Sequence, residues 1–480
     1  MKTVSRRQML KYVGLGAAGS LLAACQPQVV YETVEKVVKE TVIIEGEEKV
    51  VEKVVVETRV VEKEAQPVTD SITLRFVDNH GGLQGIDRPG LKELLFDWQQ
   101  EYPNIRVDYM NIGAGDEYYN VLNTQAVGGS LPDLFYCRTF LTETFASRGW
   151  IVNLSPYIEA HGIDTTDFWE ALLAQMSWEG NQYSLPYDFS NMGFYYNKDI
   201  LAEMGVDAPS DDWTWEDFEQ FCGQLVELED GKPSRWATTL SVGSWTFLGH
   251  LVANDGRLWT EDRKTCVLAS EENIEVFEQL VQMRNRNIFP EGGIVPDGVD
   301  AWTSGLTVMR HEGSWATAGV RAQVEDKYEW DVAAMPMNSK TGMRALSAAG
   351  GAWSVGVHSD HPDEAFLLCD WVSNTAALQK MISEPVRSIP GRKSAVDLWV
   401  QNATAGGLPP ANVEVFARQM EDEICVEPYP PFWQDFDIIW NNRIPSLVFG
   451  GGDQELDVRE HLTLMQEEIQ DVIDRYWAAV

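Results

Sequence analysis

The stretch SITLRFVDNHGG at residues 71–82 alternates apolar and polar side chains and then passes into a polar, Gly-rich loop. It is followed by the amphipathic pattern LKELLFDWQQEYPN at 91–104 and by a second alternating stretch, IRVDYMNIG, at 105–113. Alternation predicts strands and helical spacing predicts a helix. The order β-loop-α-β is the start of a doubly wound α/β sheet. Ligands of such sheets lie beyond the carboxyl ends of strands, where Asn79 and His80 follow the first strand.

The same alternation of elements continues along the chain. The stretch EYYNVLNTQAVGGS at 117–130 predicts a helix closed by glycines, and LPDLFYCR at 131–138 predicts a short buried strand ending near Arg138. Farther on, Thr214 with Asp217 predicts a capping box at a helix start. At HSDHPDEAF, 358–366, Ser359 or Asp360 is expected to cap a helix that has Pro362 in its first turn.

The N-terminal stretch SRRQMLKYVGLGAAGSLLAAC at 5–25 combines basic residues, a short apolar run and a final cysteine. The run is shorter than the roughly 20 apolar residues of a spanning helix, so it predicts an export signal. Residues 5–11 resemble a twin-arginine signal, an address read by a receptor. Leu22-Ala23-Ala24-Cys25 resembles a bacterial lipobox, in which Cys25 is acylated. We expect an exported protein that is lipid-anchored to the outer face of a membrane.

Residues 26–66 form a Val-, Glu- and Lys-rich segment in which V-E-K-V-V recurs. Its valines are too numerous for an ordinary disordered linker, so helical, extended and neighbour-dependent conformations all stay open. The favoured interpretation is a semi-stiff tether between the lipid and the body.

The net charge of the chain limits the classes of molecule that it is expected to bind. The 480 residues carry 74 acidic and 37 basic side chains, for a formal net charge of −37. Such a charge repels phosphate backbones, so no nucleic-acid partner is expected. Small anionic ligands are also disfavoured, although a local basic pocket can hold one. The cysteines after Cys25 are widely spaced and odd in number, which predicts mostly buried thiols and leaves open one disulfide that the sequence cannot assign.

Several segments of the body resemble one known family. They are GSLPDL at 129–134, YSLPYDFSNMGFYYNKDILAEMGV at 183–206, GLTVMRHEGSWATAGV at 305–320 with WDVAAMPM at 330–337, GGAWSVGVHSDHPDEAFLLCDWV at 350–372, and RSIPGRKSA at 387–395. Their order and spacing are similar to those of extracellular solute-binding proteins of the sugar-binding class, the maltose-binding-protein family that feeds ATP-driven importers. The resemblance covers nearly all of residues 70–480.

The resemblance implies a two-lobed periplasmic-binding-protein-like α/β fold of type II, with a doubly wound sheet in each lobe and a hinged cleft between them. Chain crossings are expected near 188–193, 350–354 and 402–410. Lobe 1 would comprise 67–188 plus 351–402, and lobe 2 would comprise 189–350 plus 403–480. Ligand would be captured by hinge bending.

A sugar presents apolar C–H faces and rings of hydroxyls, so its binding calls for aromatic surfaces beside acids, amides or guanidinium groups. The resemblance places four Trp-bearing stretches near the cleft, and for each Trp the alternative is core packing. These candidates are Trp245, Trp315, Trp353 and Trp433. Asp188 is expected to accept sugar hydroxyls or else to cap a hinge, and the preceding Tyr187 is a further ligand-binding candidate. Further candidates are Asn79, His80, Arg138 and Arg392, the last of which has pairing with the acidic surface as its alternative.

Enzyme signatures are missing from the sequence. It contains no G-x-S-x-G elbow, Walker loop or H-E-x-x-H, and with 74 acids a carboxylate pair carries no signal. The metal-like spacing at 358–361 is better explained as a helix start. We expect no catalytic residue, metal or cofactor. The favoured function is sugar capture for an importer; a polyamine, peptide or glycerol-phosphate binder and a secreted glycan-active enzyme stay as alternatives. Expected partners are the sugar, permease subunits and, through Cys25, the membrane; a monomer is expected.

Overall fold

The predicted β-α-β start of the body is present in the computed structural model. β3 (Ile72–Val77) and β4 (Ile105–Met110) are parallel neighbours, with α2 (Pro89–Glu101) between them in the chain. The structure describes residues 28–44, 47–63, 71–79, 89–113, 115–344, 346–383, 385–422, 424–425, 429–450 and 457–479. The predicted signal at 1–25, with Cys25, and the candidate His80 lie outside these residues.

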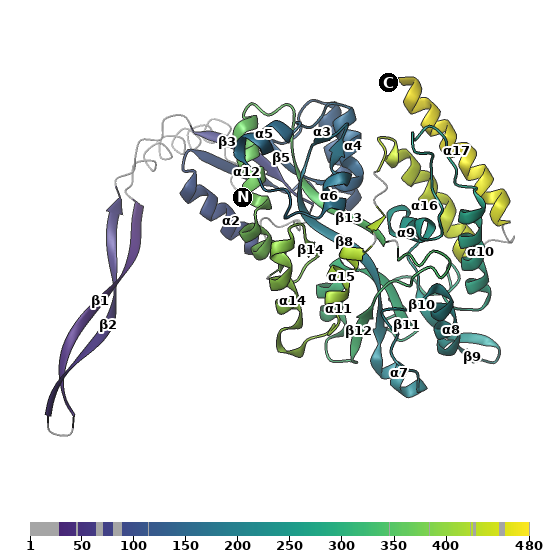
Figure 1. Ribbon diagram of the computed structural model, residues 1–480, viewed down its shortest axis with the longest axis horizontal. Coiled ribbons are helices and arrows are strands. Elements are labelled where there is room, and N and C mark those ends of the chain that lie inside the picture. Colours follow the sequence, from purple (N-terminus) through teal and green to yellow (C-terminus); the bar gives the residue numbers. More distant parts are fainter. Residues whose placement is uncertain are drawn as a thin grey trace, which may run out of the picture. The chain divides into compact units, whose positions relative to one another are not determined.

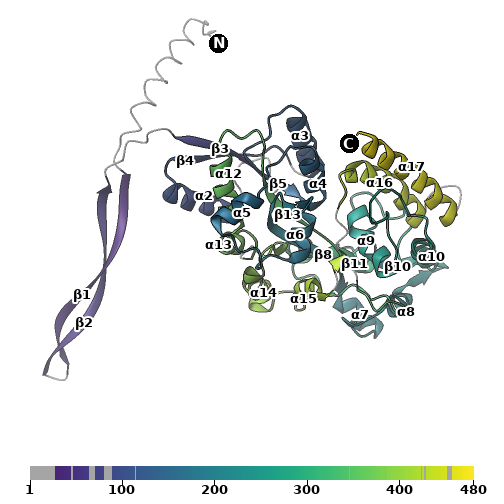
Figure 2. The same ribbon diagram turned by 45° about the horizontal axis from the view of Figure 1, so that its top comes forward.

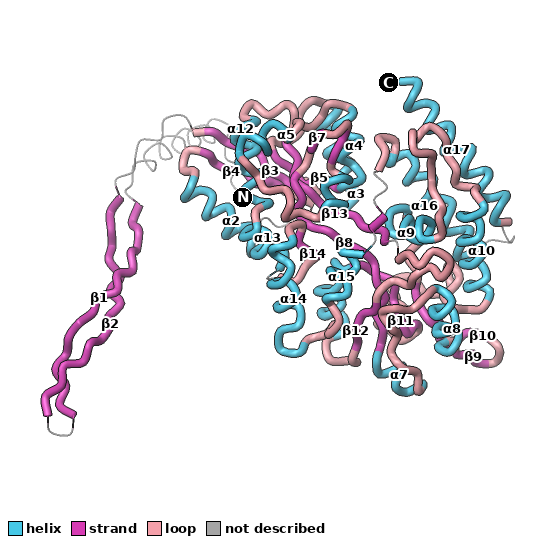
Figure 3. The backbone as a smooth tube through the Cα atoms, in the orientation of Figure 1, coloured by secondary structure: helices cyan, strands magenta, loops and turns pink. Residues whose placement is uncertain are grey.

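Helices and strands alternate through the body, as the mixed α/β class requires (Figure 3). Further strands are β5 (Leu134–Arg138), β6 (Ser177–Trp178), β7 (Asn181–Gln182), β8 (Leu185–Asn197), β9 (Glu227–Glu229), β10 (Lys232–Thr239), β11 (Thr307–Gly313), β12 (Trp330–Ala333), β13 (Leu346–Val355), β14 (Ile389–Pro390) and β15 (Ile424–Cys425). Further α-helices are α3 (Gly115–Val127), α4 (Thr139–Ser147), α5 (Ser155–His161), α6 (Glu170–Gln175), α7 (Lys198–Met204), α8 (Trp215–Leu225), α9 (Ser244–Ala253), α10 (Glu271–Asn285), α11 (Thr317–Val324), α12 (Pro362–Ser373), α13 (Thr375–Leu378), α14 (Val396–Thr404), α15 (Glu414–Asp422), α16 (Trp433–Phe449) and α17 (Val458–Ala479). Short helical turns are η2 (Ser314–Ala316), η3 (Gln379–Ser383), η4 (Lys393–Ala395) and η5 (Ala405–Gly407).

The long strand β8 joins two groups of strands (Figure 1). Its first half pairs with β13 and β14 and its second half with β11 and β12, all antiparallel. Beyond β13 the order continues through β5 and β3 to β4, and beyond β11 through β10 to β9. Every residue of β8 is buried, as expected of a strand with neighbours on both edges and helices around it.

Two apolar cores form around the two groups of strands. The first gathers β3, β5, β13 and helices such as α2 and α12, whereas the second gathers helices α8, α9, α10, α16 and α17 (Figure 2). The first core also includes Trp302 and Trp330, which come from the stretch 189–350 predicted for lobe 2. The lobe boundaries in the sequence therefore stay a prediction, while the presence of two cores is a property of the structure.

Consecutive glycines let β13 approach β8 and β5 closely. A Cβ on Gly350 would lie 2.2 Å from the carbonyl oxygen of Asp188, and a Cβ on Gly351 would lie 2.0 Å from the ring of Tyr136. The register between β13 and β8 shifts directly after Gly351. Glycine is thus required here because another backbone and a ring occupy the space of a side chain.

Of the two predicted helix starts, one is confirmed in full and the other only in part. Thr214 and Asp217 form the predicted capping box: the backbone N–H of Thr214 donates to the Asp217 carboxylate at 2.9 Å, and that of Asp217 donates to the Thr214 hydroxyl at 3.2 Å. For α12 the predicted Pro362 in the first turn is confirmed, but the predicted cap by Ser359 or Asp360 is wrong, because His361 occupies the N-cap position without a side-chain cap. Ser359 instead donates its hydroxyl to the Asp133 carboxylate, at 2.6 Å.

The described cysteine side chains of the body agree with the predicted thiols. Cys137, Cys222, Cys266 and Cys369 are free and buried. Burial raises the pKa of the Cys137 thiol to about 12, so the group stays neutral and unreactive at ordinary pH.

The segment before the body forms an antiparallel hairpin of its own. β1 (Gln28–Ile44) pairs with β2 (Glu47–Lys63) in a register that sets Gln28 opposite Lys63 and Ile44 opposite Glu47 (Figure 1). Of the alternatives left open by the sequence, the extended conformation is the one observed for these strands. Among the described helices, none combines the length and the apolar content that a membrane crossing requires.

Gly350→Ala tests the close crossing of β8 and β13. The added methyl group would meet the backbone of Asp188, so the two strands would have to separate. We expect the free energy of unfolding to fall by about 1–3 kcal/mol, a typical result of overpacking. Urea denaturation at neutral pH measures the change.

The matched control is Gly319→Ala in α11, where nothing lies within 4 Å of the added Cβ. This variant should be neutral or more stable by up to about 1 kcal/mol, since alanine favours helix. Equal effects of the two substitutions would contradict the crowding at Gly350.

Candidate functional site

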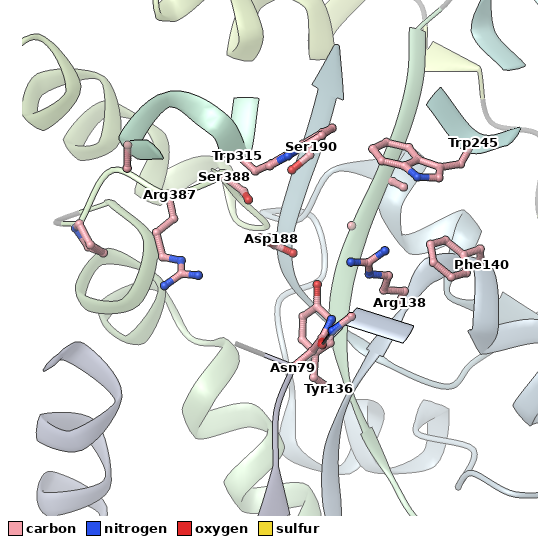
Figure 4. A pocket seen from close by; sticks show the side chains of 15 residues that line it. Asn79, Tyr136, Arg138, Phe140, Asp188, Ser190, Trp245, Trp315, Arg387 and Ser388 are labelled. Carbon is pink, nitrogen blue, oxygen red and sulfur yellow. Dashed lines mark hydrogen bonds between the residues drawn. The ribbon is translucent and has the colours of Figure 1, made fainter. Parts of the chain in front are cut away.

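A cavity of about 650 Å³ opens beside the crossing of β8 and β13 (Figure 4). Strands β5, β8 and β13 supply one part of its lining. The rest comes from the loop after β3, from α3, α4, α9, η2 and α11, and from the segment before β14. The lining residues are Asn79, Gly115, Tyr136, Arg138, Phe140, Asp188, Ser190, Trp245, Trp315, Ala318, Ala349, Gly350, Pro385, Arg387 and Ser388.

The sheet presents polar groups to the cavity at alternate positions. Asp188 and Ser190 follow each other at a spacing of two on β8, and Tyr136 and Arg138 do so on β5, so each pair shares one face of its strand. One carboxylate oxygen of Asp188 accepts a hydrogen bond from the backbone N–H of Gly351 at 2.8 Å. Asp188 is therefore held in place by the crossing itself.

Two indoles form an aromatic surface over the cavity. The ring centroids of Trp245 and Trp315 are 5.3 Å apart with planes at 49°, and both side chains line the space in Figure 4. Trp315 is 37% exposed. Its ring lies against the backbone of Gly313, where a Cβ would come within 1.7 Å of an indole carbon. The sequence Gly313-Ser314-Trp315 therefore sets this ring, because only glycine leaves room for it.

The lining around Arg138 is mostly aromatic. Its guanidinium carbon lies 5.3 Å from the ring centroid of Tyr119 and 5.4 Å from that of Phe140. These distances suit cation–π contacts, which fix a cationic group without neutralising its charge.

Tyrosine hydroxyls near the cavity stay neutral. Burial raises the pKa of Tyr119 and of Tyr136 well above the usual range, so both keep their protons at ordinary pH. Asn79 donates a side-chain N–H to the Tyr119 hydroxyl at 3.0 Å and accepts from the backbone N–H of Gly115 at 2.7 Å. Asn79 thus ties α3 to the end of β3.

Arg387 and Ser388 come from the short segment before β14. That strand pairs with β8, with Ile389 opposite Phe189 and Pro390 opposite Asp188. The pairing brings the segment to the edge of the cavity, and Figure 4 shows Arg387 and Arg138 on either side of Asp188.

A second hollow of about 590 Å³ shares Arg138, Phe140 and Trp245 with the cavity. Its other walls are parts of α3, α9 and α16 that carry several carboxamides. Trp433 belongs to this hollow but is only 2% exposed, and its ring packs on Tyr429 at 4.5 Å. The structure therefore places Trp433 mainly in the second core and at the wall of this hollow, not in the main cavity, and its contact with a ligand stays a prediction.

The predicted site residues that line the main cavity are Asn79, Arg138, Asp188, Trp245 and Trp315. The cavity brings them together from distant parts of the sequence. Their contact with a ligand stays a prediction.

Trp353 and Tyr187 lie in the first core instead. Trp353 is fully buried and packs on Phe76, Tyr136 and Tyr187, with ring centroids 5.1, 5.8 and 5.0 Å away. Because β13 lies between β5 and β8, helices and neighbouring rings cover this position. The prediction that Trp353 and Tyr187 contact ligand is corrected: both are packing residues.

Arg392 is also structural. It lies over the ring of Phe168, with 3.9 Å between its guanidinium carbon and the ring centroid, and it donates to the carbonyl of Ser373 at 2.7 Å. It also pairs with Asp167 at 3.4 Å. These contacts lie away from the cavity lining, so Arg392 is removed from the candidate site.

Sequence reasoning missed Tyr136, Phe140, Ser190 and Arg387. Period-2 alternation offers a signal for two of them, because Tyr136 lies two residues before Arg138 and Ser190 lies two residues after Asp188. Arg387 lies in the same short stretch as Arg392, and no local pattern tells the two arginines apart.

The described part of the chain holds no group of three or more His, Cys, Asp or Glu side chains arranged to bind a metal ion. What the cavity offers is a set of hydrogen-bonding groups on stiff strands, facing two aromatic rings. This arrangement suits reversible binding of a small polar molecule with apolar faces.

The model of a protein family described as "Bacterial extracellular solute-binding protein" matches residues 81–379, well over half of the chain. The chain belongs to this family. It is therefore a bacterial extracellular solute-binding protein, a class of non-enzymatic receptors.

Curated relatives of this solute-binding protein are distant. The lactose-binding protein of Rhizobium radiobacter is 24% identical over 378 residues, which are 76% of this chain and 82% of the relative. The erythritol/L-threitol-binding protein of Mycolicibacterium smegmatis is 21% identical over 330 residues, which are 60% of this chain and 65% of the relative.

Solved structures confirm the predicted periplasmic-binding-protein fold. An ABC substrate-binding protein of Listeria monocytogenes in complex with cycloalternan has a TM-score of 0.71 and 22% identity, over 84% of this chain and all (100%) of the other. UgpB of Mycobacterium tuberculosis in complex with glycerophosphocholine has a TM-score of 0.70 and 22% identity. The match covers 85% of this chain and 99% of UgpB. At these identities the likeness shows the fold alone.

Trp353→Ala and Trp315→Ala should differ sharply in stability. Truncating the fully buried Trp353 leaves a void in the first core, and we expect a loss of about 3–5 kcal/mol in the free energy of unfolding. Truncating the half-exposed Trp315 removes its contact with Trp245 and should cost less than about 1.5 kcal/mol. Chemical denaturation measures both, and losses of equal size would contradict the placement of these two residues.

Proposed function

We propose that this protein captures a carbohydrate and delivers it to the permease of an ABC importer. The observation that carries the proposal is the pair of indoles, Trp245 and Trp315, over a cavity that also holds Asp188 and Arg138. An indole surface covers the apolar C–H face of a sugar ring, while the charged groups form strong hydrogen bonds with its hydroxyls.

The polar side of the cavity supports this ligand class. Asp188 can accept from two neighbouring hydroxyls, and Ser190 on the same face of β8 can donate or accept. A volume of about 650 Å³ has room for more than one sugar ring. The relatives named for lactose and for erythritol and L-threitol bind polyhydroxylated molecules, which agrees with the proposal.

The charges of the lining argue against a polyamine. Among the described lining residues, Asp188 is the one acid, and it faces two arginines, Arg138 and Arg387. A polycation would need several carboxylates and would be repelled by the guanidinium groups. A glycerol-phosphate compound remains as a second candidate, because the arginines suit a phosphate and because a relative from Brucella abortus is named as an sn-glycerol-3-phosphate-binding protein.

Capture would occur by closure of two lobes, 67–188 plus 351–402 and 189–350 plus 403–480. The cavity has walls from both cores: Tyr136 belongs to the first, and Trp245 packs against the second. A ligand that touches both walls binds the closed form more tightly and so shifts the population toward it. The closed form would then present one surface of each lobe to the permease.

The N-terminal features give the proposed location. The twin-arginine-type signal would direct export, and Cys25 would carry the lipid. Residues 26–66 would tether the body, as a monomer, to the outer face of the cell membrane. The description of the family as extracellular agrees with this placement.

A thermal-shift panel on the chain from residue 26 onward tests the ligand class. It would contain neutral and acidic mono-, di- and oligosaccharides, spermidine, glycerol phosphates and short peptides. We expect at least one carbohydrate to raise the melting temperature, because a ligand that binds only the folded form stabilises it. Stabilisation by spermidine, peptides or glycerol phosphates with no response to any carbohydrate would overturn the proposal.

With a carbohydrate identified, Trp245→Ala and Trp315→Ala should each weaken its binding by about 1–3 kcal/mol, the usual effect of truncating an aromatic anchor. The control is Trp371→Ala, whose indole packs on Trp98 and Tyr102 away from the cavity, measured where the variant is folded. Unchanged affinity in both cavity variants would reject this binding site.

Cys25→Ser in the full-length chain tests the anchor. In a bacterial host that acylates lipoproteins, the unmodified chain should sediment with membranes and incorporate labelled palmitate, whereas the variant should do neither. Gln26→Ser is the control, because it leaves the cysteine in place. Membrane sedimentation and labelling that persist in Cys25→Ser would contradict the anchor.

A further inference from the structure

Two arginines in the cavity differ from the other shielded arginines of the described chain. Arg138 and Arg387 are both partly buried, and neither has a carboxylate within salt-bridge distance among the described residues. Arg138 rests on aromatic rings and is hydrogen-bonded to the neutral hydroxyl of Tyr119, and the Arg387 side chain has no hydrogen-bond acceptor in the described part of the chain.

Other partly or fully buried arginines donate to a carboxylate, a carbonyl or an amide oxygen of the protein. They are Arg75, Arg235, Arg263, Arg284, Arg310, Arg321, Arg344, Arg392 and Arg443. Burying an unpaired charge is costly, so this pattern is the expected one. The two exceptions line the same cavity, and among the described residues neither has a charged or carbonyl acceptor, which suits an acceptor carried by a bound ligand.

Both guanidinium groups are directed by the fold. Arg138 ends β5 and is held over Tyr119 and Phe140, while Arg387 precedes β14, which pairs with β8. Figure 4 shows them on either side of Asp188. One oxygen of Asp188 accepts a hydrogen bond from the backbone N–H of Gly351.

The local charge opposes that of the whole chain. The sequence has a net charge of −37, yet the described lining carries two guanidinium groups and one carboxylate. If a neutral ligand were enclosed here, two cations would lose water with a single counter-charge between them. An acidic group on the ligand removes this imbalance, and its paired oxygens match the parallel N–H donors of a guanidinium.

We propose that the ligand is an acidic sugar, with a carboxylate or phosphate group bound between Arg138 and Arg387 and its ring under the indoles of Trp245 and Trp315. This inference rests on the proposed carbohydrate function and names the substrate class of the same site.

Matched ligand pairs test the proposal by calorimetric titration of the chain from residue 26 onward. The pairs are glucuronate with glucose, galacturonate with galactose, digalacturonate with galactobiose, and glucose 6-phosphate with glucose. We expect at least one acidic member to bind about tenfold or more tightly than its neutral twin, since hydrogen bonds to charged groups are the stronger ones. The arm that responds distinguishes a carboxylate from a phosphate.

Arg387→Gln should weaken binding of the acidic sugar by about 10- to 100-fold while changing the affinity of the neutral twin by less than about threefold. Arg387→Lys keeps the charge and should recover part of the loss. Arg148→Gln is the matched control: this arginine is exposed and lies over Trp150, outside the cavity lining. Melting temperatures establish that each variant is folded.

The outcomes separate this proposal from the function on which it rests. Neutral sugars that bind as tightly as their acidic twins, or an equal loss for both in Arg387→Gln, would overturn the acidic ligand and leave sugar capture intact. Binding of glycerol 3-phosphate with no response to any sugar would overturn both.

Discussion

The body of this protein depends on one strand that is shared by two groups of strands. β8, Leu185–Asn197, is buried along its whole length and pairs with β13 and β14 through one half and with β11 and β12 through the other. Both edges are occupied, so a break in this pairing would separate the two cores. The same strand carries Asp188 and Ser190 into the cavity. The element that joins the molecule therefore also builds its candidate site, and the close approach of Gly350 fixes the two together.

Arg138 is a residue that local pattern could place, because it ends a short strand and ligands lie beyond the carboxyl ends of strands in such sheets. Asp188 lies inside β8, after its Pro-Tyr pair, and the family resemblance of that segment is what pointed to it. Trp315 and Trp353 show where local pattern fails. Each follows a glycine within two residues, yet Trp315 lies on η2 at the surface of the cavity while Trp353 lies on a strand between two others. The difference is tertiary, because it comes from β5 and β8 on either side of β13.

Arg387 and Arg392 make the same point about charge. They are separated by a few residues in one short stretch, and the sequence alone makes both equally good candidates for binding a ligand. Arg392 lies over the ring of Phe168 and pairs with Asp167, two residues more than two hundred positions earlier in the chain. These contacts make it a structural residue. Arg387 meets no such partner in the described chain and stays available at the cavity. A basic residue in an acidic protein thus becomes functional or structural according to what the fold places opposite it, which the sequence alone does not specify.

The acidity of the chain and the basic lining of the cavity act over different distances. At physiological ionic strength, exposed charges are screened beyond about 8 Å, so the surface acids weaken the approach of an anion without reaching far into a shielded pocket. Inside the cavity, Arg138 and Arg387 act at contact distance, where low solvent access strengthens each hydrogen bond. Under the proposed binding mode, the surface charge would affect the rate of encounter, while the two guanidinium groups would determine how long a ligand stays. Selectivity would then come from the pair of arginines and the single Asp188 between them, because changing either side alters the charge that a bound ligand must balance.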